Sequence, residues 1–173
     1  MKENKDKIEK VFMESYEEFS DAIFRYTLFQ TSNRQTAIDI SQDTFIKTWQ
    51  YLQKGQEIEN IRAFLYRVAK NLIIDHRRKK KSYSLDEMTE YGVDFRTDED
   101  LVEDQQKEFE KQKVLKTIDN VDEKYREILI LRYVEEMSIK EIGEVMDKSQ
   151  NHVSVMIHRG IEKLKKLLKD YNE

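Results

Sequence analysis

The scarcity of helix-breaking residues is the feature of this chain that most constrains its fold. Its 173 residues include no proline and only four glycines. In a helix interior, proline costs about 3 kcal/mol and glycine about 1 kcal/mol relative to alanine, so long helices can form here without interruption. Together with the 38% of residues that are charged, this scarcity predicts an all-α fold.

Apolar residues recur at helical spacing along most of the chain. A first helix is predicted over residues 8–28 and a second over residues 37–52. Asn60 is placed to cap a third helix, which ends in the basic run at 76–81. The predicted inner face of this third helix consists of Ile61, Phe64, Leu65, Val68, Ala69 and Leu72.

The acidic residues of the chain are concentrated in one segment. Residues 83–112 hold 11 acidic and three basic side chains, whereas residues 1–82 hold 12 acidic and 16 basic ones. The acidic stretch has few aliphatic residues and no lasting period, which is typical of a linker. We therefore expect two small helical domains, residues 1–82 and 109–173, joined by an acidic flexible linker at 83–108. Asp122 is placed to cap a helix in the second domain.

Several classes of protein are not expected from this composition. Without cysteine there are no disulfides, no thiolate zinc sites and no cysteine nucleophile. The N-terminal segment is charged, unlike a signal peptide, and no apolar run approaches the roughly 18 residues of a membrane span. His76, His152 and His158 have no carboxylate or cysteine partners at ligand spacing. We expect a cytoplasmic protein with no membrane insertion, no metal or other cofactor and no enzymatic activity.

The last quarter of the chain has the pattern of a helix-turn-helix. Residues 138–146 form one short amphipathic stretch, residues 147–150 are polar, and a second amphipathic stretch follows to residue 168. The second helix of such a pair commonly enters the major groove of DNA. An ordinary helical hairpin is the alternative interpretation.

The two faces of this last helix differ in chemistry. The inward row is Val153, Met156, Ile157, Gly160 and Leu164. Ser149 is placed to cap the helix. The outward side chains can hydrogen-bond base edges or, for Val155, touch a thymine methyl group; they are Asn151, His152, Ser154, Val155, His158 and Arg159.

Two further faces are candidates for binding. On the third helix, Tyr66, Arg67, Lys70, Ile74 and Arg77 fall opposite the apolar stripe, which would offer cations to phosphates and an exposed ring to bases. A solvated basic face is the alternative. Asp75 falls on the inner row and is expected to be paired.

On the second helix, the residues that face away from the stripe could dock a protein, although a single exposed Ile is common; they are Asp39, Gln42, Asp43, Ile46 and Gln50.

Three segments together resemble the extracytoplasmic-function group of bacterial sigma factors. AIDISQDTFIKTWQYL is similar to the family's region 2.2, and IRAFLYRVAKNLIIDHRRK to regions 2.3–2.4. VDEKYREILILRYVEEMSIKEIGEVM and the last helix resemble region 4. The resemblance covers roughly residues 12–80 and 110–168. It implies a transcription initiation factor that binds core RNA polymerase and promoter DNA and performs no covalent chemistry.

The resemblance also implies a role for each face. The sigma-2 domain would dock on the clamp helices of the polymerase β′ subunit through Asp39, Gln42, Asp43 and Ile46. The loop at 54–60 and the helix after it would capture the melted −10 element with Asn60, Arg62, Tyr66, Lys70, Asn71, Arg77 and Arg78. The sigma-4 domain would bind the β flap and read the −35 element with Ser149, Gln150, Asn151, His152, Ser154, Val155, His158 and Arg159. An anti-sigma factor is a further partner common in this family.

Three positions depart from the family pattern. Asp147 replaces a glycine in the turn, and Val121-Asp122 replaces Leu-Pro. In the last helix, residues 152–156 lack two cations that the family commonly has, which lowers the expected phosphate contribution. We therefore expect the isolated sigma-4 domain to bind DNA weakly.

Two other functions remain open at the level of sequence. A stand-alone helix-turn-helix regulator would bind an operator as a dimer, but it leaves the motifs at 37–78 unexplained, and no dimer face is evident. An inactive sigma paralogue that sequesters polymerase would explain the depleted cations of the last helix.

Overall fold

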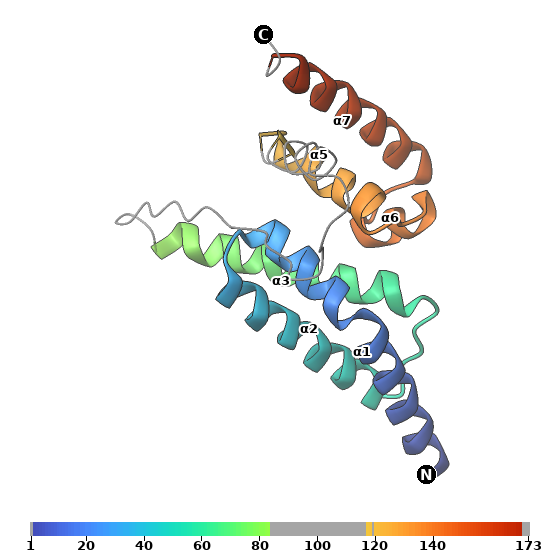
Figure 1. The fold of residues 1–173 in the computed structure, drawn as a ribbon. Coiled ribbons are helices and arrows are strands. Elements are labelled where there is room, and N and C mark those ends of the chain that lie inside the picture. Colours follow the sequence, from blue (N-terminus) through green and yellow to red (C-terminus); the bar gives the residue numbers. More distant parts are fainter. Residues whose placement is uncertain (1, 84–116, 119, 171–173) are drawn as a thin grey trace, which may run out of the picture. The chain divides into compact units, whose positions relative to one another are not determined.

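The computed structural model describes residues 2–83, 117–118 and 120–170, and these described residues contain helices and no strand (Figure 1). The all-α prediction is therefore confirmed. The predicted linker, apart from Tyr83, lies outside the described residues. The elements in chain order are α1 (Lys2–Thr31), α2 (Arg34–Gln53), α3 (Ile61–Tyr83), α5 (Glu123–Leu129), η1 (Ile130–Val134), α6 (Ile139–Met146) and α7 (Gln150–Asp170).

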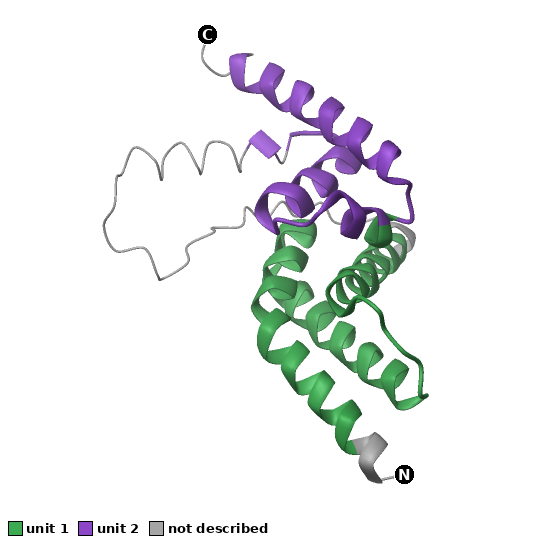
Figure 2. Cartoon of the chain, turned by 90° about the vertical axis from the view of Figure 1, so that its right-hand side faces the viewer, with its two compact units in different colours: residues 1–93, 144–146 green, residues 94–143, 147–173 purple. Residues whose placement is uncertain are grey.

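The chain divides into two compact units (Figure 2). The first consists of residues 1–93 with 144–146, and the second of residues 94–143 with 147–173. In the first unit, α1, α2 and α3 all pack against one another (Figure 1). In the second unit, α5 continues directly into the π-helix η1 and packs on α7.

The buried stripe of α2 has the predicted residues. Ala37, Ile40, Ser41, Thr44, Phe45, Thr48 and Leu52 are all buried. The stripe includes hydroxyl groups, and burying an unpaired hydroxyl is costly. Each therefore has a partner within the bundle. Thr44 and Thr48 donate to carbonyls one turn back, at 2.7 and 2.8 Å, and Ser41 Oγ lies 3.0 Å from Thr27 Oγ1 of α1.

The register of α3 differs from the prediction. The fully buried row contains Ala63, Leu65, Tyr66, Ala69 and Ile73, whereas Phe64, Val68 and Leu72 are only half-buried. Tyr66, predicted to be exposed, has no exposed surface and packs against Tyr26 of α1 at a ring-centroid distance of 5.1 Å. The prediction of an exposed ring at position 66 was therefore wrong. Burying a tyrosine ring removes a large apolar area from water, and α1 provides the surface that covers it.

Candidate nucleic-acid and protein interfaces

Local hydrogen bonds determine where the helices of the predicted helix-turn-helix begin. Ser138 starts α6 with a capping box, in which Glu141 N–H donates to Ser138 Oγ at 3.2 Å and Ser138 N–H donates to Glu141 Oε2 at 2.9 Å. Ser149 caps α7 as predicted, because His152 N–H donates to its hydroxyl oxygen at 3.3 Å. The break between the helices is therefore only three residues long, at 147–149.

The turn itself depends on two backbone positions. Asp147 takes the left-handed conformation, with φ of 53° and ψ of 52°, at the position where the family commonly has glycine. Lys148 N–H then donates to the Gly143 carbonyl at 3.0 Å. A Cβ atom at position 143 would lie 2.7 Å from the Lys148 carbonyl oxygen, closer than packed atoms normally approach. Gly143 therefore lets the chain close tightly after α6.

The two faces of α7 are as predicted from its sequence. Val153, Met156, Ile157 and Gly160 are buried and Leu164 is half-buried. A Cβ atom at position 160 would lie 3.3 Å from Leu129 of α5. The outward side chains are all exposed: Ser149, Gln150, Asn151, His152, Ser154, Val155, His158 and Arg159. Besides Ser149, which caps the helix, Ser154 and His158 have side-chain partners on α7. Ser154 Oγ donates to the Gln150 carbonyl at 3.0 Å, and His158 Nε2 lies 3.4 Å from Glu162 Oε1.

Asp122 stands at the N-cap of α5 but does not cap it with its side chain. Its carboxylate instead pairs with Lys163 of α7, whose ammonium also lies over the Tyr125 ring at 5.1 Å. The hydrogen bond from Lys163 lowers the pKa of Asp122, and the same bond raises the pKa of Lys163. The predicted cap position is therefore correct, but the carboxylate links α5 to α7 rather than closing the helix end.

On α2, the face opposite the buried stripe is exposed at every predicted position. Asp39, Gln42, Asp43 and Gln50 are exposed, and Ile46 has 52% of its surface exposed. Asp39 Oδ1 accepts a hydrogen bond from Gln35 at 3.0 Å. The surface therefore combines two carboxylates with one apolar side chain, a composition that suits contact with another protein.

The predicted strand-binding residues of α3 and of its N-cap differ in exposure, and two of them have structural roles. Asn60 caps α3 by accepting from Ala63 N–H at 3.0 Å. Arg77 is half-buried and donates to both the backbone carbonyl and Oε1 of Gln30 in α1. Arg62 and Lys70 are half-buried, while Asn71 and Arg78 are exposed. The guanidinium of Arg78 pairs with Asp75 at 3.1 Å, which confirms that Asp75 is paired.

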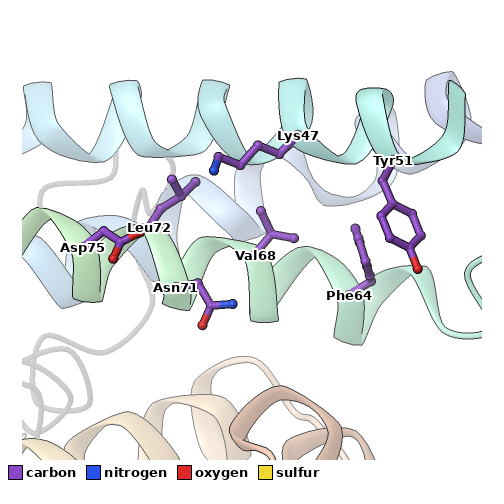
Figure 3. Close-up of a pocket in the computed structure, with 7 residues that line it drawn as sticks. All are labelled: Lys47, Tyr51, Phe64, Val68, Asn71, Leu72 and Asp75. Carbon is purple, nitrogen blue, oxygen red and sulfur yellow. The ribbon is translucent and has the colours of Figure 1, made fainter. Parts of the chain in front are cut away.

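A pocket of about 200 Å³ lies between α2 and α3 (Figure 3). Its lining combines two aromatic rings, an amide, a carboxylate and an ammonium group; the residues are Lys47, Tyr51, Phe64, Val68, Asn71, Leu72 and Asp75. The rings of Tyr51 and Phe64 are 4.7 Å apart, and the Arg67 guanidinium lies 5.5 Å from the Phe64 centroid. Such a lining can stack on a flat ring and hydrogen-bond its edge.

Sequence reasoning identified only Asn71 of these pocket residues as a binding residue. Phe64, Val68 and Leu72 belong to the stripe predicted as inner face, and a stripe alone does not distinguish a covered row from a half-open one. The signal that was available is the polar pair Asn71 and Asp75 next to that stripe. In the part of the chain that the structure describes, no group of three or more histidines and acids could hold a metal ion.

The three-helix unit and the helix-turn-helix unit together define a two-part nucleic-acid-binding protein, and comparison with known proteins identifies its family. Residues 15–83 match the sigma-70 region 2 family, and residues 111–164 match sigma-70 region 4. The chain is 34% identical over 165 residues to the ECF RNA polymerase sigma factor SigW of Bacillus subtilis, covering 88% of this chain and 86% of SigW. It is 29% identical to the RNA polymerase sigma factor YlaC of the same organism, covering 94% of this chain and 92% of YlaC.

A solved structure has the same fold. The sigma factor RpoE of Bartonella quintana, solved in complex with the anti-sigma factor NepR, matches with a TM-score of 0.73 at 19% identity. The match covers 92% of this chain and 98% of RpoE. The chain belongs to the extracytoplasmic-function group of the sigma-70 family. It is a sigma factor, which binds core RNA polymerase and directs it to promoter DNA, and the two alternative functions are not favoured.

Members of this family are not enzymes. None of the helices that the structure describes is long and apolar enough to cross a membrane.

Proposed function

We propose that each unit of this sigma factor contacts a different part of the promoter through the faces described above. Residues 1–82 would form the sigma-2 domain, residues 83–108 the linker and residues 109–173 the sigma-4 domain. The observation that carries the proposal is the outward row of α7, which is exposed at every position from Asn151 to Arg159 that does not face the core. A row of amide, imidazole and guanidinium groups above a fully buried row suits a helix that reads base edges.

The proposed contacts to the −35 element are made by the outward row of α7 and by the two residues that precede it, Ser149 and Gln150. Asn151, His152, His158 and Arg159 can hydrogen-bond base edges, and Ser149 and Gln150 stand at the start of the helix, where backbone N–H groups favour a phosphate. Ser154 already donates to the Gln150 carbonyl, so its hydroxyl oxygen would act as an acceptor. The helix has few cations, so the affinity of holoenzyme for promoters should depend on both domains.

The proposed −10 site is the α2–α3 pocket together with cationic residues of α3. A base that leaves the stack needs an aromatic platform and partners for its edge. Phe64 and Tyr51 provide the rings, and Asn71 and Asp75 provide the polar groups. Arg62, Lys70 and Arg78 would hold the opened strand. Asn60 and Arg77 would act by positioning α3, and Tyr66 by supporting it from within the core.

The proposed docking surface for the β′ clamp helices consists of Asp39, Gln42, Asp43 and Ile46. A central apolar residue within a polar surround is the usual composition of a protein interface, and about half of the surface of Ile46 is exposed. The sigma-4 domain would contact the β flap.

Three further parts of the proposal follow from family membership. We expect an anti-sigma factor as a partner, as RpoE has in its solved complex. We also expect a cytoplasmic location, where bacterial promoters and polymerase are found, and no catalytic activity or cofactor for the chain itself.

Transcription in vitro by core polymerase and this chain tests the −35 assignment. Each of His152→Ala and Arg159→Ala should reduce initiation at promoters that depend on a −35 element. The lost binding free energy should be roughly 1–3 kcal/mol for a bidentate base contact and less for a single hydrogen bond. Promoters bearing changes at single −35 positions serve as the comparison. A base contact should make the variant indifferent to one position, whereas equal loss on every −35 sequence would make the residue a backbone contact.

A further inference from the structure

Val155 is exposed at a place where apolar exposure is otherwise avoided. Among residues 149–159, the other large apolar side chains are buried: Val153, Met156 and Ile157. Val155 instead exposes 47% of its surface. The residue therefore contributes little to the core of the sigma-4 domain, and its side chain is available to a ligand.

Val155 also lies at the centre of the outward row of α7. Residues three and four positions apart are neighbours on a helix surface. Asn151 and His152 are therefore one turn before Val155, and His158 and Arg159 are one turn after it. All four are exposed and polar. A helix that places these four groups against base edges must also place Val155 against the DNA.

The chemistry of the major groove leaves one good partner for this side chain. Its floor presents hydrogen-bond donors and acceptors, and the C5-methyl group of thymine is its apolar feature. A valine against a donor or acceptor would leave that group dehydrated and unpaired, which is costly. Against a methyl group it buries apolar surface with no such loss. Valine is also stiff at χ1 in a helix, so little side-chain freedom is lost on contact.

We propose that Val155 reads the methyl group of a thymine within the −35 element. The proposal rests on the proposed function, which assigns α7 to the −35 element. It adds that this element has a thymine at the position that faces the centre of the outward row. Binding would then depend on a single methyl group of the DNA.

Replacing thymidine by deoxyuridine tests the proposal, because this change removes the methyl group and keeps every hydrogen-bonding atom. A promoter is first selected by holoenzyme from a pool randomised across the −35 element. Each −35 thymidine is then replaced singly, and the dissociation constant of holoenzyme for the duplex is measured. One replacement should weaken binding about fourfold, the effect of returning one methyl group to water.

Two variants make the test specific to the residue. Val155→Ala should bind the thymidine and deoxyuridine duplexes equally, because the partner of the methyl group is gone. Val11→Ala is the matched control, since Val11 is an exposed valine of α1, with 38% of its surface exposed. It should keep the fourfold difference. Circular dichroism checks that both variants fold.

The outcomes separate this inference from the proposed function. A −35-dependent affinity that is the same for thymidine and deoxyuridine overturns the methyl contact and leaves the −35 assignment standing. A fourfold difference that persists in Val155→Ala assigns the methyl contact to another residue and also overturns the inference. An affinity unaffected by scrambling the −35 element overturns both.

Discussion

At the scale of single residues, long-range partners decide what a side chain does. Asp122 stands at the N-cap of α5, where an aspartate often accepts from the backbone, yet its carboxylate pairs with Lys163, which is 41 residues later in the chain. Tyr66 has the amphipathic character of a surface ring, yet α1 covers it completely. In both cases the local pattern permits two outcomes, and the neighbouring helix selects one.

The Asp122–Lys163 pair predicts a pH dependence of stability. The folded pKa of Asp122 is lowered, so its contribution is present above the unfolded value of about 3.8 and is lost as pH falls through the folded value. The pKa of Lys163 is raised, so its contribution is present below the unfolded value of about 10.5 and is lost as pH rises through the folded value.

Asp122→Asn should therefore lower the melting temperature slightly at neutral pH, and this difference should vanish at a pH where the wild-type carboxylate is protonated. Both groups are solvent-exposed, so the effect should also decrease at high salt. Thermal unfolding between pH 2 and pH 8 measures it. Asp21→Asn, the same change at an exposed site of α1, is the control. A difference from wild type that does not vary with pH would contradict a role for the pair.

Burial of Tyr66 predicts that its loss is a folding defect. Tyr66→Ala should lower the free energy of unfolding by about 3–5 kcal/mol, as large aromatic-to-alanine changes in cores do. Tyr66→Phe should retain most of the stability, because the ring packing against Tyr26 remains. Denaturant titration gives both values. Normal stability of Tyr66→Ala combined with impaired promoter opening would contradict burial and restore a role in base contact.

At the scale of helices, the clarity of an apolar stripe limits what can be predicted. The apolar stripe of α2 is narrow and flanked by acids and amides. Its buried and exposed faces can therefore both be predicted from the helical periodicity of its sequence. Helix α3 has apolar or aromatic side chains at seven of the eight positions 64–69 and 72–73, around much of its circumference. Helical periodicity therefore does not distinguish Tyr66 from Phe64 as the inner residue. For this reason the half-buried row that lines the pocket was missed.

Backbone features were predictable only where they depend on side chains close by in the sequence. The caps at Asn60 and Ser149 are local, and their side chains bond within three residues. The π-helix η1 was not predicted. It ends at Val134. Just after it, Glu136 takes a positive φ of 52° and the Met137 carbonyl accepts a hydrogen bond from Arg132 at 2.8 Å. No residue type in that stretch signals this geometry.

The α6–α7 turn predicts opposite effects for two substitutions. Gly143→Ala should lower the free energy of unfolding by about 1–3 kcal/mol, because its Cβ would overlap the Lys148 carbonyl oxygen and the turn would have to open. Asp147→Gly should raise it by about 1 kcal/mol, because glycine takes the left-handed conformation without strain. Denaturant titration of both variants decides. A Gly143→Ala variant as stable as wild type would mean that the turn is looser than described.

At the scale of the whole molecule, the chain combines two units whose exposed surfaces differ in chemistry. The first unit has exposed acidic residues on the outer face of α2 and a pocket between α2 and α3 whose lining includes Lys47. The second presents the outward row of α7. A sigma factor needs both kinds of surface, because it must hold polymerase and promoter together. The resemblance in three ordered segments made this function predictable, whereas the promoter sequence depends on departures such as those at residues 152–156.

Charge reversal on α2 tests the docking surface. Asp43 is exposed, so Asp43→Arg should leave the stability unchanged within about 0.5 kcal/mol and weaken binding to core polymerase several-fold. Fluorescence titration of labelled chain with core enzyme measures the affinity. Asp21→Arg, the same reversal on α1, is the control. Equal affinities of Asp43→Arg and wild type would place the docking surface elsewhere.

The most direct test of the central claim is transcription in vitro of fragmented genomic DNA from the source bacterium, by its core polymerase with and without this chain. Mapping of RNA 5′ ends provides the readout. We predict discrete new start sites that share upstream −35 and −10 motifs and disappear when either motif is scrambled. The absence of new start sites, together with no stable binding to core polymerase, would contradict the account.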